Sequence, residues 1–156
     1  MKTILGIDPG FGRMGFGCLR IAPGKTEVLD YGIASTDAAL EFGQRLVAIA
    51  ADVETLLDAH KPDAVAIEKL YFTKNEKTAM QVAEARGVIL YLCVKRGIQI
   101  HEFTPSQVKK AVGGDGTADK AGMMRIVSEI LALRRTPKFD DAADALAIAL
   151  AASGMR

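Results

Sequence analysis

The first third of the chain carries short runs of apolar and β-branched residues separated by turn-forming residues. Residues 3–7 form one such run, which ends at Asp8-Pro9-Gly10, where proline cannot donate to a strand ladder and glycine permits a turn. Two further runs, residues 14–21 and 27–34, are joined by Pro23-Gly24-Lys25. The pattern predicts three strands linked by short turns, as in an antiparallel meander.

The apolar spacing then changes to a helical period. Residues 39–60 place apolar side chains every three or four positions, which predicts an amphipathic helix that ends at Pro62-Asp63. The other predicted elements are a buried strand over 64–67 closing on Glu68, a helix over 75–96, a strand over 98–103, a helix opening at 104–106, a flexible loop at 113–116, a helix over about 118–133, and a last helix from Asp140 or Asp141 to near Gly154.

The order βββ-α-β-α-β-α-α-α predicts a fold class. A meander followed by alternating strands and helices is typical of an α/β fold with a five-stranded mixed sheet and helices on both faces. The 156 residues, 49% hydrophobic and 25% charged, suit one globular domain, which we expect to span residues 1–156.

Cysteine content and hydropathy bear on the compartment. Cys18 and Cys93 lie far apart and outside any Cys-x-x-Cys pattern, which argues against a disulfide scaffold and a cysteine zinc site. No apolar stretch of signal-peptide length follows the N-terminus, and the apolar tract at 82–94 is too short to span a bilayer. We therefore expect a soluble, cytoplasmic protein with no membrane contact.

The net charge of +1 hides an uneven distribution. Residues 1–72 carry 7 basic and 10 acidic residues, residues 73–138 carry 12 and 6, and residues 139–156 carry 1 and 3. A basic central block between acidic ends indicates a polyanionic partner such as nucleic acid, although solvated helix faces give similar runs.

Acidic residues stand at the ends of several predicted elements. If the first and fourth strands are neighbours, Asp8 and Glu68 emerge at one end of the sheet. Residues three or four positions apart share a helical face, so Asp144 can point the same way as Asp140 or Asp141. Carboxylates that converge without a basic partner need divalent cations, and oxygen-only ligands favour Mg²⁺ or Mn²⁺ over zinc. Two such ions, about 3.5–4 Å apart, can support phosphodiester hydrolysis.

Each of these acids also has a purely structural interpretation. Asp8 before Pro-Gly can form an Asx turn, and Glu68 can be a solvated strand end. Asp140 or Asp141 can cap the last helix or interact favourably with its dipole. Asp144 is harder to explain in this way, because it lies one turn into a helix whose apolar residues cover much of its circumference.

Several motifs occur in order along almost the whole chain. They are Gly-Ile-Asp-Pro-Gly at 6–10 with Gly-Phe-Gly at 15–17, Ile-Glu at 67–68, the segment 75–87 ending Glu-Ala-Arg-Gly, Pro-Ser-Gln-Val-Lys at 105–109, Ala-Asp-Lys at 118–120, and Asp-Ala-Ala-Asp-Ala-Leu-Ala at 141–147. In these motifs and their spacing the chain resembles the RuvC-type Holliday junction resolvases.

The resemblance implies an RNase H-like fold and a homodimeric endonuclease. Such an enzyme binds four-way DNA junctions in recombination and repair, cuts two opposite strands symmetrically, and leaves 5′-phosphate and 3′-hydroxyl ends. The resemblance also implies that it works beside a branch-migration motor complex of the RuvA and RuvB type.

The family's acidic tetrad falls on Asp8, Glu68, Asp141 and Asp144. The resemblance implies that these four residues are catalytic and hold two Mg²⁺ or Mn²⁺ ions, with Asp8 bridging them. The Asp-x-x-Asp spacing selects Asp141 over Asp140, which leaves Asp140 as the expected helix cap.

The resemblance also assigns contacts to DNA and to a second subunit. Lys109 and Lys120 match family lysines that contact the DNA backbone, and solvated helix surface is their structural alternative. Tyr71 and Phe72 match an aromatic pair that inserts into or stacks at the opened junction, although Phe72 can instead pack into the core. The helix over 75–96 is apolar enough to pack on the sheet and to supply a dimer face.

The chain departs from the family pattern at two positions. Met14 stands where a small hydroxyl residue, commonly Thr, is usual, which puts a polar role near Asp8 in doubt. Asp115 adds an acidic residue to a loop expected to approach phosphates.

Three rival functions can be compared with the resolvase. A related nuclease that trims ribosomal RNA precursors shares the first motif but not the later ones. A sugar-kinase-like phosphotransferase needs a second half for which 156 residues leave no room. A junction-binding module without catalysis is not favoured by a complete tetrad.

Overall fold

A mixed β-sheet forms the centre of the protein. The structure is a computed structural model in which residues 1–70, 76–113 and 119–154 are described. In chain order, these residues form β1 (Lys2–Asp8), β2 (Arg13–Ala22), β3 (Lys25–Ser35), α1 (Phe42–His60), β4 (Ala64–Glu68), α2 (Glu76–Lys95), β5 (Gln99–Phe103), α3 (Pro105–Gly113), α4 (Lys120–Ile130) and α5 (Asp140–Ser153).

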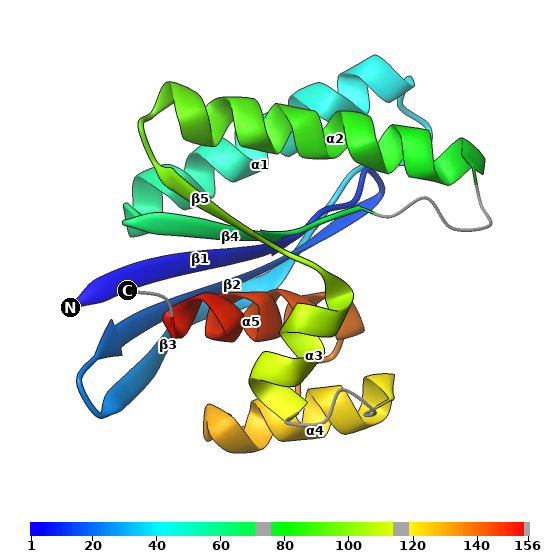
Figure 1. The fold of residues 1–156 in the computed structure, drawn as a ribbon. Coiled ribbons are helices and arrows are strands. Elements are labelled where there is room, and N and C mark those ends of the chain that lie inside the picture. Colours follow the sequence, from blue (N-terminus) through cyan, green and yellow to red (C-terminus); the bar gives the residue numbers. More distant parts are fainter. Residues whose placement is uncertain (71–75, 114–118, 155–156) are drawn as a thin grey trace.

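The strands lie in the order β3-β2-β1-β4-β5 (Figure 1). β1, β2 and β3 pair in antiparallel fashion, whereas β1, β4 and β5 pair in parallel. The first three strands need only short turns, and the parallel strands are joined by connections that contain α1 and α2. The predicted element order and five-stranded mixed sheet are thus confirmed.

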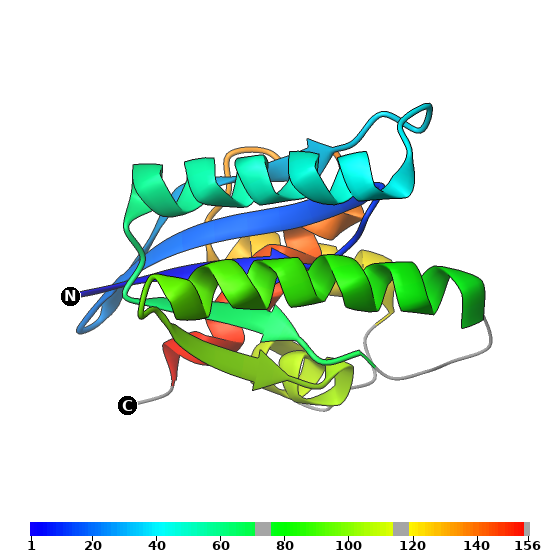
Figure 2. The ribbon, with the colours of Figure 1, turned by 90° about the horizontal axis from the view of Figure 1, so that it is seen from above.

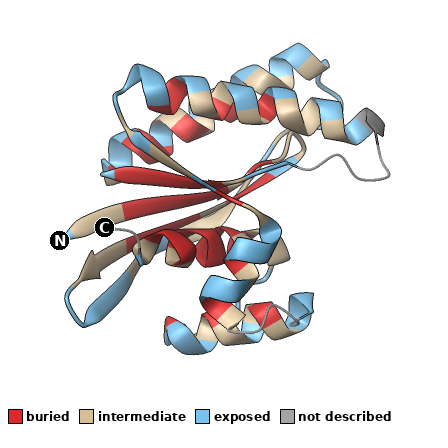
Figure 3. Ribbon diagram, in the orientation of Figure 1, coloured by how far each residue is buried: buried red, intermediate tan, exposed pale blue. Residues whose placement is uncertain are grey.

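Helices cover both faces of the sheet. α1 and α2 lie side by side over one face, and α5 lies on the other, with α3 and α4 beside it (Figures 1 and 2). Alternate side chains of β1 enter different apolar layers: Leu5 and Ile7 pack under α1 and α2, whereas Ile4 packs towards α5. Buried residues therefore line both faces of the central strands and much of α5 (Figure 3).

The helix predicted from residue 39 begins later, at Phe42. Asp37 folds the preceding residues into a turn, because its carboxylate accepts a hydrogen bond from Ala39 N at 2.9 Å and its carbonyl accepts one from Leu40 N at 3.2 Å. A local side-chain bond to the backbone thus competes with the first turn of the helix.

Two other helix ends also differ from the prediction. α4 ends at Ile130 and not at 133, because Ala132 has a φ of 46°, a left-handed conformation that stops a helix. Gly113, predicted in a loop, is the last residue of α3, and the rest of that loop lies outside the described residues. No helix in the described segments is long and apolar enough to cross a membrane.

α5 approaches the sheet closely because glycines lie beneath it. A Cβ atom on Gly6 would overlap the carbonyl oxygen of Ala145, and one on Gly15 would overlap that of Asp141. Alanine side chains on the buried side of α5 add little bulk between the helix and the strands. The start of α5 is therefore held against the end of β1, where Asp8 lies.

Candidate active site

The C-terminal ends of β1 and β4 lie side by side. The two strands pair in parallel with Ile7 beside Ile67, so Asp8 and Glu68, their last residues, leave the sheet at the same edge. Ile7 and Ile67 belong to the apolar layer under α1 and α2, and the side chains that follow them therefore point to the opposite face, towards α5. The structure places these two carboxylates together, as the sequence predicts.

The first turn of α5 carries the other acids of the predicted site. Phe139, with φ −118° and ψ 137°, occupies the N-cap position, and Asp140 is the first helical residue. The prediction that Asp140 is the cap is therefore wrong by one position, although its carboxylate accepts a hydrogen bond from Asp141 N at 3.2 Å. The Cβ of Asp141 lies against Gly15, the residue that pairs with Asp8.

Negative charge accumulates where these elements meet. Burial raises the pKa of the Asp8 carboxyl to about 8, and the charges of Asp144, Glu68 and Asp141 add to this effect. Burial also raises the pKa of Glu68, with Asp144 as the second cause. The ammonium group of Lys120 acts in the opposite direction on both carboxyls. The other three predicted carboxylates thus lie within electrostatic reach of Asp8.

A pocket of about 200 Å³ opens beside these carboxylates. Glu68 and Asp144 line it together with Lys109 and Lys120, and α3 and α5 supply most of its apolar wall. Four of the predicted site residues, from β4, α3, α4 and α5, therefore share one concave surface with carboxylates and ammonium groups.

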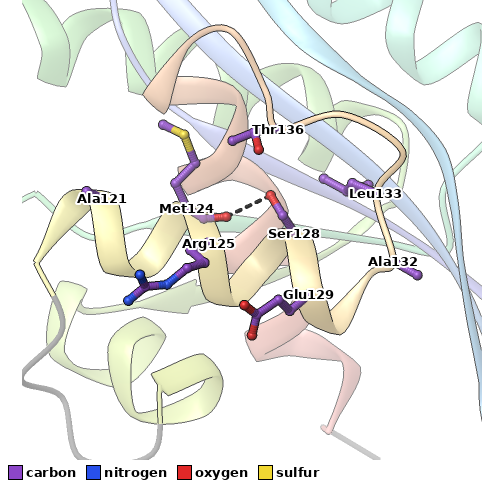
Figure 4. Close-up of a pocket in the computed structure, with 8 residues that line it drawn as sticks. All are labelled: Ala121, Met124, Arg125, Ser128, Glu129, Ala132, Leu133 and Thr136. Carbon is purple, nitrogen blue, oxygen red and sulfur yellow. Dashed lines mark hydrogen bonds between the residues drawn. The ribbon is translucent and has the colours of Figure 1, made fainter.

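A larger groove, of about 700 Å³, lies on α4 and the loop after it (Figure 4). Arg125 and Glu129 are its charged side chains, and Ser128 Oγ donates to the carbonyl of Met124 at 2.8 Å. None of the four predicted carboxylates lines this groove, so its size does not make it the better candidate for a phosphodiester site.

Two cations neutralise part of the acidic cluster. Arg13, at the start of β2, forms an ion pair with Asp141 and lies 3.8 Å from Asp140, while Lys120 Nζ donates to Asp140 at 3.1 Å. Arg13 was not among the predicted site residues. Its place in the chain offers a signal in retrospect, because β2, the antiparallel partner of β1, begins beside the end of β1, where Asp8 lies.

The donor atoms of the cluster suit a hard divalent cation. All four predicted ligands are carboxylates, and Asp141 Oδ2 is buried without a hydrogen bond even though Arg13 Nε is paired with it electrostatically. In their present rotamers, however, no three Asp, Glu, His or Cys side chains of the described residues are gathered tightly enough to hold an ion. The chemistry of the donors fits Mg²⁺ or Mn²⁺.

Of the departures and aromatic residues noted in the sequence, only Met14 belongs to the residues that the structure describes. Met14 is fully buried in the layer under α1 and α2, on the opposite face from Asp8, so a hydroxyl side chain at this position would not point to the carboxylates. Tyr71, Phe72 and Asp115 lie outside the described residues.

Known sequences match this chain over nearly its full length. The crossover junction endodeoxyribonuclease RuvC of Petrotoga mobilis is 47% identical over 154 residues, which cover 99% of this chain and 94% of that protein. The protein of the same name from Gloeobacter violaceus is 50% identical over 148 residues, covering 94% and 85%. The resolvase motifs are thus part of an extended similarity.

Solved structures and a family model agree with this similarity. Thermus thermophilus RuvC has a TM-score of 0.86 at 33% identity, over 96% of this chain and 92% of that chain. A structure of T. thermophilus RuvC in complex with a Holliday junction substrate gives 0.85 at 30% identity, over 96% and 91%. The sequence model described as crossover junction endodeoxyribonuclease RuvC matches residues 4–152. With its motifs, its sheet and this match in agreement, the chain belongs to the RuvC family of crossover junction endodeoxyribonucleases.

Proposed function

We propose that this endonuclease resolves four-way DNA junctions with Asp8, Glu68, Asp141 and Asp144 as its catalytic carboxylates. The observation that carries the proposal is the convergence of their charges from β1, β4 and α5 on one edge of the sheet, which helps to raise the pKa of Asp8. The similar Thermus thermophilus protein in complex with a Holliday junction substrate supports the choice of DNA. Residues 1–156 then act as one nuclease domain.

The same four carboxylates are proposed to hold two Mg²⁺ or Mn²⁺ ions. When bound, such a pair of ions activates water and stabilises the leaving oxygen of a phosphodiester. Asp8 is central among the four, because its pKa responds to the charges of all three others, and it is proposed as the bridging ligand. Asp141 would bind a metal ion through its carboxylate, beside the guanidinium of Arg13 that pairs with it in this structure.

Lys109 and Lys120 are proposed to bind phosphates of the DNA beside the scissile bond. Both line the pocket that contains Glu68 and Asp144, and the side chain of Lys120 is 77% exposed. Asp140 orients Lys120 through its hydrogen bond and does not need to be a metal ligand in this arrangement. Each ammonium group that neutralises a phosphate contributes to salt-dependent affinity.

The proposed dimer places two sites on one junction. The outer surface of α2 exposes Met80, Tyr91 and Val94, at 63%, 62% and 66%, while Ala85 and Ile89 face the sheet. A second copy seated on this face gives the two-fold symmetry that paired cuts need. Tyr71 and Phe72 at the junction centre, and a branch-migration motor complex of the RuvA and RuvB type, remain proposals from the family resemblance.

The experiment is cleavage of a mobile four-way DNA junction, compared with a linear duplex of the same sequence. Reactions contain Mg²⁺, Mn²⁺ or EDTA, and Asp144→Asn is compared with the native chain. We expect paired, symmetric nicks in the junction and none in the duplex. EDTA should abolish this cleavage, and Asp144→Asn should reduce its rate by at least about 100-fold.

Two results would contradict the proposal. Binding of the junction without cutting in either metal would contradict catalysis by this cluster. Equal cutting of the duplex would contradict selectivity for the junction.

A further inference from the structure

Arg86 is a charged residue held in a largely buried position on α2. Its neighbour Ala85 is fully buried against the sheet, as is Ile89 one turn further on. The side chain of Arg86 is only 15% exposed. Arg86 is not one of the residues predicted to bind DNA or to act in catalysis, so neither role explains its burial. A guanidinium cannot be neutralised inside a protein, so its partners must account for its position.

Both partners of Arg86 lie at the ends of the parallel strands. Arg86 Nε donates to the carbonyl oxygen of Glu68 at 3.0 Å, and its Nη2 forms an ion pair with the carboxylate of Glu102. Glu102 lies on β5 beside Ile67, and the next residue pair in the register is Glu68 with Phe103. One side chain from α2 therefore spans the last paired positions of β4 and β5.

The contact fixes the backbone at the point where the Glu68 side chain leaves the sheet. Glu68 is the last residue of β4, where a backbone carbonyl loses the regular ladder and needs another donor. The following residue is also tied down, because Lys69 N donates to the carbonyl of Phe103 at 2.7 Å. The carboxylate of Glu68 is thus directed towards α5 while its carbonyl is bound from α2.

We propose that Arg86 is a positioning residue for Glu68, acting through the backbone carbonyl and locked in place by Glu102. The inference rests on the proposed role of Glu68 as a metal ligand. It adds α2 to the elements that set the geometry of the site. Groups that orient a metal ligand without touching the metal commonly change metal affinity by about 10–100-fold.

Arginine suits this task better than lysine. The planar guanidinium presents Nε and Nη2 in a fixed fork, so one side chain can bind a carbonyl and a carboxylate at set angles. A lysine has one ammonium group on a flexible stem and would hold one partner well at the expense of the other. Glu102→Gln leaves the Glu68 carbonyl bond possible but removes the charge that fixes the fork.

The chain offers a matched control in Arg96, just after the opposite end of α2. Arg96 Nη1 donates to Asp58 at 2.6 Å and Nη2 lies 3.8 Å from Glu54, with a side chain that is 30% exposed. It also joins α2 to a neighbouring element through acidic partners, but it touches no candidate ligand. Arg96→Gln therefore reports the effect of losing a structural ion pair on α2.

The test measures Mn²⁺ binding by calorimetry on the full chain without DNA, and junction affinity in EDTA. We expect Arg86→Gln to weaken Mn²⁺ binding about 10-fold or more, and Arg86→Lys and Glu102→Gln to weaken it about 3-fold. Junction affinity in EDTA should stay within about twofold of the native value, because the contact acts on a metal ligand. Arg96→Gln should leave Mn²⁺ binding unchanged. Urea unfolding measures how far each of the two variants, Arg86→Gln and Arg96→Gln, is destabilised.

A folded Arg86→Gln protein with native Mn²⁺ affinity would overturn the inference, and so would equal losses in Arg86→Gln and Arg96→Gln. If Arg86→Gln does not fold, Glu102→Gln and Arg86→Lys decide the matter in the same assay. Glu68→Gln is included to separate the two proposals: native Mn²⁺ binding by that variant would contradict the ligand role of Glu68 itself.

Discussion

Asp8 illustrates how a single residue can link folding to the site's chemistry. With a pKa raised to about 8, mainly by burial, its carboxyl retains a proton near neutral pH in the metal-free protein. A metal ion bound at the proposed site would displace that proton, so its binding would release protons and strengthen as pH rises. The same residue that is proposed to bridge two ions is therefore costly to ionise without them.

The first prediction is that the stability of the metal-free protein falls as pH rises from about 4 to about 8. Asp8 binds a proton more tightly when folded than when unfolded, so its favourable contribution is complete below the unfolded pKa and is lost as pH passes the folded pKa. Asp8→Asn should flatten this decline and raise the free energy of unfolding at pH 8 by about 2 kcal/mol. Urea unfolding in EDTA across the pH range measures both effects.

Comparing the two proteins at each pH cancels the titration of other groups, such as His101. Glu68 and Asp144, whose pKa values are also raised, should leave some residual slope in Asp8→Asn. Added Mg²⁺ should stabilise the native chain more than the variant at pH 8. Identical pH profiles for the two proteins would contradict the prediction.

At this scale the sequence points to the four acids and, through the family resemblance, to Lys120, but not to Arg13. Asp8 and Glu68 stand beside turn signals at strand ends, and Asp144 is conspicuous in an apolar helix, so local patterns point to them. The turn after Asp8 places Arg13 near the end of β1, but its ion pair with Asp141 depends on how α5, distant in the sequence, packs on the sheet. Local sequence patterns give little information about such contacts between segments that are distant in the chain.

At the scale of elements, the closeness of α5 to the sheet decides where its carboxylates lie. A methyl group on Gly6 would meet three atoms of α5, among them the backbone nitrogen of Ala149 at 2.7 Å and the Ala149 Cβ at 2.9 Å. A helix backbone cannot yield locally as a flexible side chain can. The whole of α5, including Asp144, must therefore shift if Gly6 acquires a side chain.

The second prediction concerns Gly6→Ala. We expect it to lower the free energy of unfolding by about 1–3 kcal/mol through overpacking, and to reduce junction cleavage more than junction binding. Gly43→Ala is the control, since a Cβ on this exposed residue of α1 would meet nothing within 4 Å beyond its chain neighbours and the backbone of its own helix, and alanine is the better helix former. Urea unfolding and cleavage rates measure the two effects. A Gly6→Ala protein as stable and active as Gly43→Ala would show that α5 has freedom to move.

Most elements follow from periodicity, whereas their ends depend on particular backbone bonds. The change from strand-like runs to helical spacing after residue 39 is enough to give the element order and the mixed sheet. α1 begins later than its apolar pattern because the Asp37 side chain bonds to the backbone of Ala39 and holds these residues in a turn. α4 ends before Ala132, which adopts a left-handed φ of 46°. Neither event changes the hydrophobic pattern, so the pattern cannot reveal it.

At the scale of the whole molecule, the two faces of the sheet have different tasks. α5, α3 and α4 lie on one face and α1 and α2 cover the other (Figure 1). Residues of α3, α4 and α5 line the pocket that contains Glu68 and Asp144. Arg86 connects these sides, because it extends from α2 to the backbone of Glu68. A subunit contact on the outer surface of α2 would thus lie near the support of one proposed metal ligand without entering the proposed site.

The last prediction tests whether the outer face of α2 forms the contact of the proposed dimer. Tyr91 is 62% exposed in the single chain, and burying a charge in its place without a partner costs far more than leaving it in water. We expect Tyr91→Glu to weaken dimerisation at least about 10-fold, equivalent to about 1.4 kcal/mol. Ile130→Glu, at a 51% exposed position on α4 across the sheet, should leave the dimer intact.

Sedimentation measures the mass of the protein in solution, and cleavage of a cruciform plasmid distinguishes paired cuts from single nicks. Because paired cutting needs two sites on one junction, Tyr91→Glu should accumulate singly nicked plasmid, and a Tyr91→Glu protein that stays dimeric would place the subunit contact elsewhere.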